Sequence, residues 1–257
     1  SSPAEMAESA NHIQIFVTNG EALISVLREM APALTPRHII LAHATISPRE
    51  AVEAASIVHD RHAAYLDAPF TGSRDAASEG KLIYYIGGDP AVLDRVRPLL
   101  EVTSKQILPI GNIGQASAVK IATNLMSACA VAALGEALAL LHHQGVGLDK
   151  LSAALENNAA RSGASDLKLP CMLSGDFQPR FALKNMLKDI KIALSMADEA
   201  DIELPAAAAF AGVAMAGIQR GWGEDDVSAI ARFYDFPGKG HIIAEKKAAP
   251  VQSAEPE

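Results

Sequence analysis

Lys120 and Asn124 are four residues apart in a long apolar stretch of the chain. Between Ala116 and Leu141 the only charged residues are Lys120 and Glu136. Residues four apart in a helix share a face, so the ammonium and the carboxamide would project side by side. Burial lowers the pKa of a lysine and suits it to proton transfer, while the carboxamide could orient a substrate. The alternative is a lysine near the start of a helix whose charge reaches water along its own stem.

A small polar turn, Thr71-Gly72-Ser73, follows an apolar run that ends in Asp67-Ala68-Pro69. Glycine and serine suit turns for conformational reasons alone. The hydroxyl and backbone N–H groups of such a turn can also hold a small anion at the end of a buried strand. Arg74 could add positive charge there, although a solvent-facing arginine is the simpler interpretation.

Two further features are weak evidence for a functional site when each is taken alone. Gly111 and Gly114 precede the long apolar stretch, where they could let a ligand approach the positive N-terminus of a helix or could serve as a hinge. Lys188 and Asp189 are adjacent in a helical pattern, which more often indicates a solvated pair than a site.

Composition excludes several classes of partner. The 257 residues are 49% hydrophobic and 20% charged, which is typical of globular protein, and the net charge of -8 argues against nucleic acid or an anionic membrane. Cys129 and Cys171 predict free thiols and a cytoplasmic protein. The most apolar run, residues 120–136, is short for a membrane span, so we expect a buried core helix and no membrane partner. Five of the eight histidines, His43, His59, His62, His142 and His143, lack metal-ligand spacing, so we expect no metal.

The elements that must position these residues differ between the two halves of the chain. The first half predicts strands alternating with helices, and therefore a largely parallel sheet. Its strands are expected at residues 12–19, 37–45, 63–70, 81–88 and 105–111. Beyond Gly114 only helices are expected, at residues 116–145, 149–157, 184–200, 205–220 and 225–233. We predict an α/β domain over residues 1–113, an all-α domain over 114–240 and a disordered tail over 241–257.

Three segments in this order resemble the β-hydroxyacid dehydrogenase family, which includes 3-hydroxyisobutyrate dehydrogenases and tartronate, glyoxylate and succinic semialdehyde reductases. The segments are "DAPFTGSRDAASEGKL", "GNIGQASAVKIATN" and "FALKNMLKDIKIAL". The likeness extends over residues 2–233. It implies a Rossmann-type domain, here incomplete, followed by an all-α domain like that of 6-phosphogluconate dehydrogenase.

The resemblance implies hydride transfer between NADP or NAD, with NADP favoured, and a small carboxylate substrate. Lys120 would be the catalytic acid, and Asn124 would bind the substrate beside it. Thr71, Gly72 and Ser73 would bind the substrate carboxylate. Val17, Thr18, Thr45 and Lys188 would lie along the cofactor. The segments at residues 157–170 and 181–186 are expected to line the substrate pocket.

The chain departs from the family pattern in several places. No Gly-x-Gly-x-x-Gly hexad occurs in the 257 residues, so the phosphate-binding loop of the family has no counterpart here. We therefore expect a first βαβαβ half to be missing in front of Ser1, and the sequence to be a fragment, a proteolysed product or a sequence that lacks a disordered start. Ala42 and Ala44 replace polar residues of the family, and Ala116 replaces a glycine.

Two classes of function follow. The first is an oxidoreductase that reduces a small aldehyde acid, of the glyoxylate, succinic or tartronate semialdehyde type; the runner-up is a 3-hydroxyisobutyrate-type dehydrogenase working in the oxidative direction. The second class is a truncated or degenerate homologue without catalysis. The apolar all-α half predicts a homodimer or homotetramer.

Overall fold

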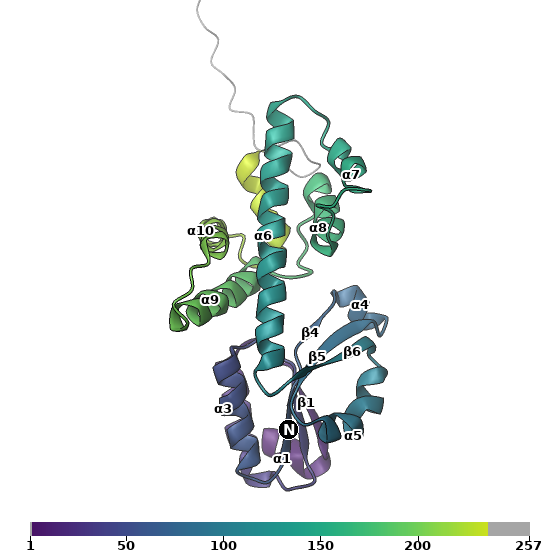
Figure 1. The fold of residues 1–257 in the computed structure, drawn as a ribbon, viewed down its shortest axis with the longest axis vertical. Helices are drawn as coiled ribbons and strands as arrows, with labels where there is room; N and C mark the ends of the chain where they lie inside the picture. Colours follow the sequence, from purple (N-terminus) through teal and green to yellow (C-terminus); the bar gives the residue numbers. More distant parts are fainter. Residues whose placement is uncertain (1, 236–257) are drawn as a thin grey trace, which may run out of the picture.

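The apolar runs of the first half form one six-stranded sheet in the computed structural model, which describes residues 2–235 (Figure 1). The strands are β1 (His12–Ile15), β2 (Ile39–Ala42), β3 (Ala64–Asp67), β4 (Phe70–Thr71), β5 (Leu82–Gly87) and β6 (Ser104–Gly111). Their order is β1-β2-β3-β5-β4, and β6 also pairs with β5. The predicted α/β class with a parallel sheet and a helical second half is confirmed.

Parallel pairing brings the carboxyl ends of the first three strands to one edge. Ile15 pairs with Ala42, and Ala42 pairs with Asp67. Beyond Asp67 the chain leaves this ladder at Ala68-Pro69, where proline has no N–H to donate. β4 then pairs antiparallel with β5, and β5 runs antiparallel to β3 and parallel to β6. This bend at the end of β3 is the antiparallel element that the sequence pattern did not predict.

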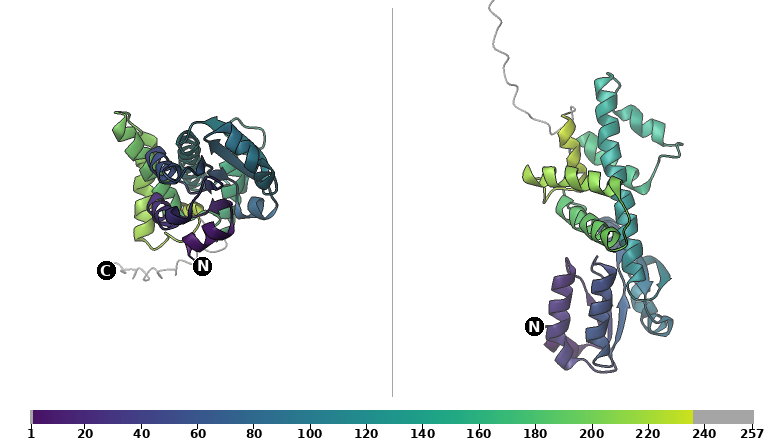
Figure 2. Two further views of the ribbon diagram at one scale, coloured as in Figure 1. Left: turned by 90° about the horizontal axis from the view of Figure 1, so that it is seen from below. Right: turned by 60° about the vertical axis from the view of Figure 1, so that its left-hand side comes forward.

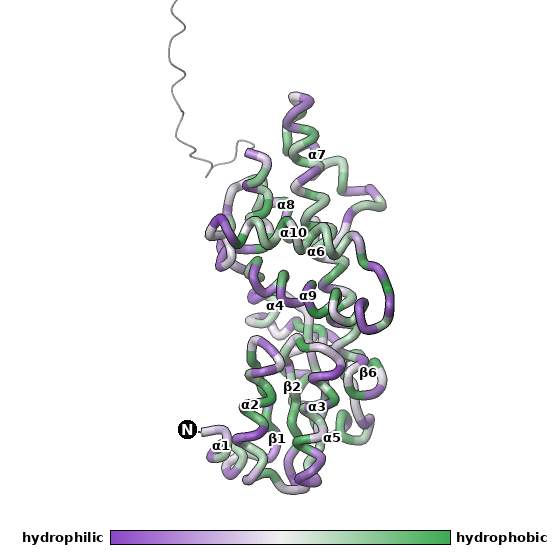
Figure 3. The backbone as a smooth tube through the Cα atoms, turned by 90° about the vertical axis from the view of Figure 1, so that its left-hand side faces the viewer, coloured by the Kyte–Doolittle hydropathy of each residue, from purple (hydrophilic) through white to green (hydrophobic). Residues whose placement is uncertain are grey.

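Helices cover both faces of the sheet. They are α1 (Pro3–Ser9), α2 (Gly20–Met30), the 3₁₀ turn η1 (Ala31–Ala33), α3 (Pro48–His59), α4 (Arg74–Ser78) and α5 (Pro90–Glu101). Local sequence explains how the two longest of these helices begin. Ser47 caps α3 and Asp89 caps α5, and each cap is followed by proline at the first helical position. α2 and α3 share one apolar core with β1, and α5 packs on the opposite face. Figure 3 shows hydrophobic colour concentrated along β2, between these layers.

The second half contains α6 (Gln115–His143), α7 (Asp149–Leu155), α8 (Gly163–Ser174), α9 (Leu183–Glu199), α10 (Pro205–Gln219) and the 3₁₀ helix η2 (Val227–Tyr234). The sequence analysis did not predict α1 or α8, and the segment expected as an α-helix at 225–233 is 3₁₀. The predicted tail, residues 241–257, lies outside the described residues. α6 extends from the α/β domain through the helical domain, and α9 lies between α3 and α10 (Figures 1 and 2).

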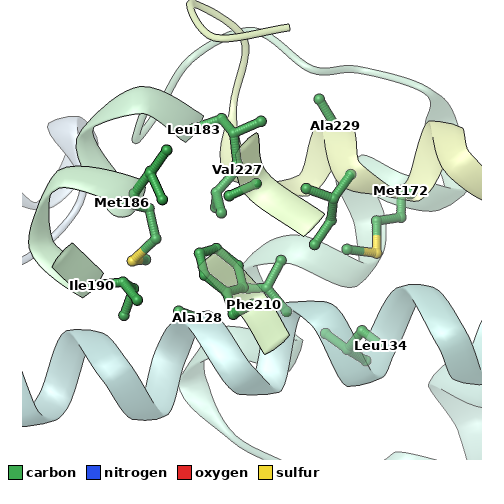
Figure 4. Close-up of a cluster of buried hydrophobic side chains, with 14 of the residues drawn as sticks. Ala128, Leu134, Met172, Leu183, Met186, Ile190, Phe210, Val227 and Ala229 are labelled. Carbon is green, nitrogen blue, oxygen red and sulfur yellow. The ribbon is translucent and has the colours of Figure 1, made fainter. Parts of the chain in front are cut away.

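The helical core gathers around Phe210, which is 1% exposed (Figure 4). Ala128 and Leu134 of α6 contact this core from one side, and Met186 and Ile190 of α9 belong to the same cluster. α6 is apolar on nearly all sides, and among the described residues it alone has the length and composition of a membrane-spanning helix. Packing buries only part of its surface.

A buried ion pair ties the helical domain together. The Lys168 ammonium of α8 donates to both oxygens of Asp226, at 2.9 and 2.8 Å. Asp226 is fully buried and also accepts from the backbone N–H groups of Arg180, Phe181 and Ser228 and from the Ser228 hydroxyl. Burial favours the neutral acid, but these donors outweigh it and lower the pKa of Asp226. One carboxylate therefore joins α8, the strand-like segment before α9, and η2.

Asp226→Ala leaves the Lys168 charge buried without its partner. We expect the free energy of unfolding, measured by urea denaturation, to fall by about 3–5 kcal/mol. Arg49→Ala is the control, because its ion pair with Glu199 is largely exposed, and the change there should stay below about 1 kcal/mol. Equal effects of the two substitutions would contradict the role given to Asp226.

Candidate active site

The long helix α6 begins without a cap of its own. Its N-cap residue is Gly114, which has a left-handed backbone (φ +89°) and no side chain, and its first turn contains no acidic residue. Asp67, at the end of β3, supplies the missing acceptors. Its Oδ2 accepts from the N–H groups of Gly114 (3.0 Å) and Ser117 (2.9 Å), and its Oδ1 accepts from the Ser117 hydroxyl (2.7 Å). The end of the sheet is thus joined directly to the first turn of α6.

The next turns of α6 carry Lys120 and Asn124 on the same buried face as Ser117. Both residues are 8% exposed. No residue among 2–235 gives the Lys120 ammonium a hydrogen bond or a close ion pair. Most of the Lys120 side chain is therefore shielded, although its ammonium is not among the described side-chain atoms that are completely closed off from solvent.

Asn124 belongs to a polar network that crosses between the domains. Its Nδ2 donates to Asp189 Oδ2 of α9 at 2.6 Å, which leaves the carboxamide oxygen of Asn124 available to a ligand. The Lys188 ammonium donates to the Thr45 carbonyl oxygen, beyond β2, at 2.6 Å. It also lies 2.7 Å from Asp189 Oδ1, although no donor within the described chain is aligned with that oxygen for a hydrogen bond.

This environment changes the acidity of Lys120. Burial lowers the pKa of Lys120 from 10.5 to about 8, because the charged form loses its hydration. The Asp189 carboxylate opposes this shift, and the Lys188 ammonium adds to it. The result is a lysine that is mostly protonated near neutrality and can exchange its proton within the physiological range.

The predicted substrate turn lies at the edge of the α/β domain that faces the helical domain, where Figures 1 and 3 place α4. Thr71 is half-buried at the end of β4. Gly72 has φ +143°, and a Cβ there would lie 2.7 Å from Leu82 Cδ2, so the turn requires glycine. The Ser73 hydroxyl oxygen accepts from the Ala76 N–H at 3.1 Å and caps α4. The exposed Arg74 follows it.

His43 anchors this segment from behind. Its Nδ1 lies 2.7 Å from the Ala68 carbonyl oxygen, and its ring stacks on Phe16 with centroids 4.4 Å apart. Burial lowers the pKa of His43 to about 4, although the Ala68 contact opposes the shift, so the ring is neutral. His43 is 4% exposed and therefore belongs to the interior of the domain.

The predicted cofactor residues lie at the carboxyl ends of β1 and β2. Val17 is half-buried and Thr18 is exposed just beyond β1, while Thr45 is half-buried beyond β2. The structure joins Thr45 to Lys188, and joins Asn124 to the same network through Asp189. The Val17–Thr18 segment and the Thr71–Ser73 turn have no hydrogen bond to this network among the described residues.

Sequence reasoning gave no role in the site to two acidic residues. Asp189 is 1% exposed, so its interpretation as half of a solvated pair is wrong; its place on the apolar side of α9 was the available signal. Asp67 had no assigned role. The signal was a helix that begins with glycine and has no capping side chain of its own. No group of three or more His, Cys, Asp or Glu within residues 2–235 is arranged to hold a metal ion.

Two family models match consecutive parts of the chain. "NAD binding domain of 6-phosphogluconate dehydrogenase" matches residues 1–112, and "NAD-binding of NADP-dependent 3-hydroxyisobutyrate dehydrogenase" matches residues 114–234. Together they account for both halves of the fold and meet at the start of α6.

Individual relatives agree with these matches. The chain is 30% identical to 2-(hydroxymethyl)glutarate dehydrogenase from Eubacterium barkeri over 77% of its own length and 66% of that protein. It is 33% identical to 2-hydroxy-3-oxopropionate reductase from Escherichia coli, over 63% of its own length and 55% of the relative. It therefore spans less than two thirds of the length of either relative.

A solved structure extends the likeness to the whole fold. 3-Hydroxyisobutyrate dehydrogenase from Salmonella typhimurium superimposes with a TM-score of 0.83 at 26% identity, over 90% of this chain and 82% of that one. The chain belongs to the β-hydroxyacid dehydrogenase family of NAD(P)-dependent oxidoreductases.

Proposed function

We propose that this protein reduces a small aldehyde acid, of the glyoxylate, succinic or tartronate semialdehyde type, to the hydroxy acid, with NADPH favoured over NADH. The observation that carries the proposal is the Lys120 ammonium, buried without a hydrogen-bond partner in the described chain one turn before Asn124. The name of the 2-hydroxy-3-oxopropionate reductase supports an aldehyde acid as the substrate class.

The residues present fit the nicotinamide part of the cofactor. In open α/β sheets, ligands bind outside the carboxyl ends of parallel strands, and β1 and β2 end together at Val17–Thr18 and Thr45. Lys188 places a cation against Thr45 at this edge. These four residues would hold the cofactor, and the bound cofactor would supply the hydride. The 257 residues contain no glycine hexad for its pyrophosphate.

Lys120 holds the proton that the reduction requires. As negative charge develops on the carbonyl oxygen of the substrate, the Lys120 Nζ donates its proton to that oxygen and stabilises the charge. Because burial has lowered the pKa of Lys120, proton release costs less than it would for an exposed lysine. Asn124, fixed by Asp189, presents its carboxamide oxygen to a hydroxyl group of the substrate or of the hydroxy-acid product.

The substrate carboxylate would be held by the turn beyond β4. Thr71 offers a hydroxyl, and Gly72 offers a backbone N–H on a segment that no other residue type can follow without strain. The Ser73 oxygen is occupied by its helix cap, so Ser73 would contribute through its backbone N–H or its hydroxyl proton. Hydrogen bonds to a charged acceptor are among the stronger ones, which suits this turn to orient a small acid.

The second candidate is a 3-hydroxyisobutyrate-type dehydrogenase that oxidises its substrate. The Salmonella structure carries that name. The same residues serve the reverse reaction, in which neutral Lys120 accepts the hydroxyl proton. The two candidates differ in the substrate that gives the higher kcat/KM.

The experiment that tests the proposal uses the purified 257-residue chain. NADPH binding is measured by fluorescence titration, and turnover is followed by nicotinamide absorbance with glyoxylate, succinic semialdehyde, tartronate semialdehyde and 3-hydroxyisobutyrate. The proposal expects an aldehyde acid to give the highest kcat/KM. A preference for 3-hydroxyisobutyrate favours the second candidate, and absence of both binding and turnover indicates a non-catalytic homologue.

Lys120→Met tests both the role of Lys120 as the acid and the cost in folding stability of burying its charge. We expect kcat to fall by about 10²–10⁴-fold. Since the folded-state pKa is lowered from 10.5 to about 8, removing the buried charge should raise the free energy of unfolding near pH 7 by up to roughly 3 kcal/mol. Steady-state kinetics and urea denaturation measure the two effects.

The pH dependence provides the control for this substitution. The wild-type reduction rate should fall as pH rises through about 8, where Lys120 loses its proton, and the oxidation rate should rise over the same interval. Lys191→Met, on α9, removes a lysine outside the proposed site and should change neither kcat nor the profile. A Lys120→Met enzyme with near-normal turnover would refute the acid role.

Thr71→Ala removes the hydroxyl assigned to the substrate carboxylate. We expect KM for the acid to rise by about 10–100-fold, the loss of one hydrogen bond to a charged group, with a smaller change in kcat. Thr71→Ser keeps the hydroxyl and should restore most of the affinity. Changed thermal stability with unchanged KM would show that the assignment is incorrect.

We also infer that two or more copies associate through α6. Met126 and Leu140 lie about four helical turns apart on one face of α6 and are 70% and 64% exposed. A long helix that is apolar on all sides needs a covering for its remaining surface.

Sedimentation velocity should therefore give the mass of a dimer or tetramer. Met126→Lys should shift the distribution toward the monomer. Val102→Lys is the matched control, because Val102 is also highly exposed (76%) but follows α5 in the other domain. A monomeric wild type would contradict the inference.

A further inference from the structure

Asp67 is a buried carboxylate with no counter-ion in the described part of the chain. It is 1% exposed, and its partners are neutral: two backbone N–H groups and the Ser117 hydroxyl, all in the first turn of α6. Burial raises the pKa of Asp67, and the donors at the start of α6 offset this only in part. All of these hydrogen bonds of the Asp67 carboxylate therefore come from the start of α6.

The same residue is joined to the substrate turn by a short piece of chain. Asp67 ends β3, and Thr71 ends β4 four residues later. This piece cannot shift freely, since Ala68 O is held by His43 Nδ1 at 2.7 Å and Pro69 O accepts from the Tyr85 N–H at 2.9 Å. A movement of α6 relative to Asp67 is therefore also a movement relative to Thr71.

On the helix side, Ser117 is followed three residues later by Lys120. Each helical residue advances the chain by about 1.5 Å, so these two Cα atoms differ by about 4.5 Å along the axis. Ser117, Lys120 and Asn124 share the buried face of α6. The contact between Asp67 and Ser117 therefore lies less than one turn from the proposed acid.

We propose that Asp67 is a positioning residue for the reaction: by capping α6 from the end of β3, it sets the placement of the Lys120 ammonium relative to the Thr71-Gly72 turn. The inference rests on the proposed function for the role of Lys120. Misplacing a catalytic group by about 1 Å can cost about 100-fold in rate. Loss of this cap should therefore affect turnover more than substrate affinity.

The experiment compares Asp67→Ala, Asp67→Asn and Ser117→Ala in the 257-residue chain, at a temperature well below each unfolding midpoint. Asp67→Ala should lower kcat by about 10–100-fold with KM for the aldehyde acid changed by less than about threefold. Asn retains one acceptor oxygen, so Asp67→Asn should recover part of this loss. Ser117→Ala, which removes one hydroxyl, should lower kcat several-fold and serves if the Asp67 variants do not fold.

Ser228→Ala is the matched control. The Ser228 hydroxyl also donates to a buried aspartate, Asp226, at 2.8 Å, and Ser228 is as fully buried as Ser117. Its loss should lower the unfolding midpoint as Ser117→Ala does and leave kcat unchanged. If Ser117→Ala and Asp67→Ala likewise lower only the midpoint, Asp67 is a structural cap and the proposal is overturned.

A second readout does not depend on activity. The titration of Lys120, followed by NMR of its side-chain nitrogen, should move to higher pH in Asp67→Ala, because a displaced ammonium gains water while Asp189 and Lys188 on α9 remain unchanged. An unmoved titration in a folded variant overturns the positioning role. A wild-type chain without turnover would refute the proposed function alone, and this titration would still decide the role of Asp67.

Discussion

The burial of one ammonium group without an opposing charge of its own is the constraint on which the site depends. The nearest acid, Asp189, is already engaged by Asn124 and Lys188, so it reduces the cost of burying Lys120 without forming a salt bridge with it. A salt bridge would hold the proton on Lys120 more tightly. The arrangement instead keeps Lys120 charged near neutrality and able to release its proton when a substrate oxygen becomes basic.

The helix α6 contacts both domains and places the buried lysine between them. The first turn of α6 is held to the sheet by Asp67, and its second and third turns carry Lys120 and Asn124 toward α9. Beyond them, Ala128 anchors the helix in the apolar core around Phe210. Lys188 closes the arrangement from α9 onto Thr45. One continuous helix, α6, therefore carries both Lys120, the proposed acid, and Asn124, the residue proposed to orient the substrate, and joins them to the end of β3.

The alternating apolar runs and the long charge-poor stretch were sufficient to predict an α/β half and a helical half, whereas the role of the Lys120–Asn124 pair was implied by the family resemblance and stays a prediction. The first two are local properties, because helix periodicity and strand composition depend on residues that are close together in the sequence. The join of β3 to an antiparallel β5 was not predictable, since it depends on where Pro69 interrupts a ladder between distant segments. The sequence could not assign the contacts of Asp67 and Asp189 for the same reason, because their partners are 47 to 65 residues distant. α8 has local signals, a capping Ser162 and a left-handed Gly175 at its end, but Pro170 inside it obscures the helical pattern.

Direct titration of the Lys120 side-chain nitrogen by NMR, in the protein without cofactor or substrate, tests the central claim most closely. The account predicts that the midpoint of Lys120 lies near pH 8, about two units below the exposed lysines of the same chain. A midpoint equal to that of the exposed lysines would mean that the ammonium is hydrated in solution. In that case Lys120 would not be the tuned acid on which the reaction is proposed to depend.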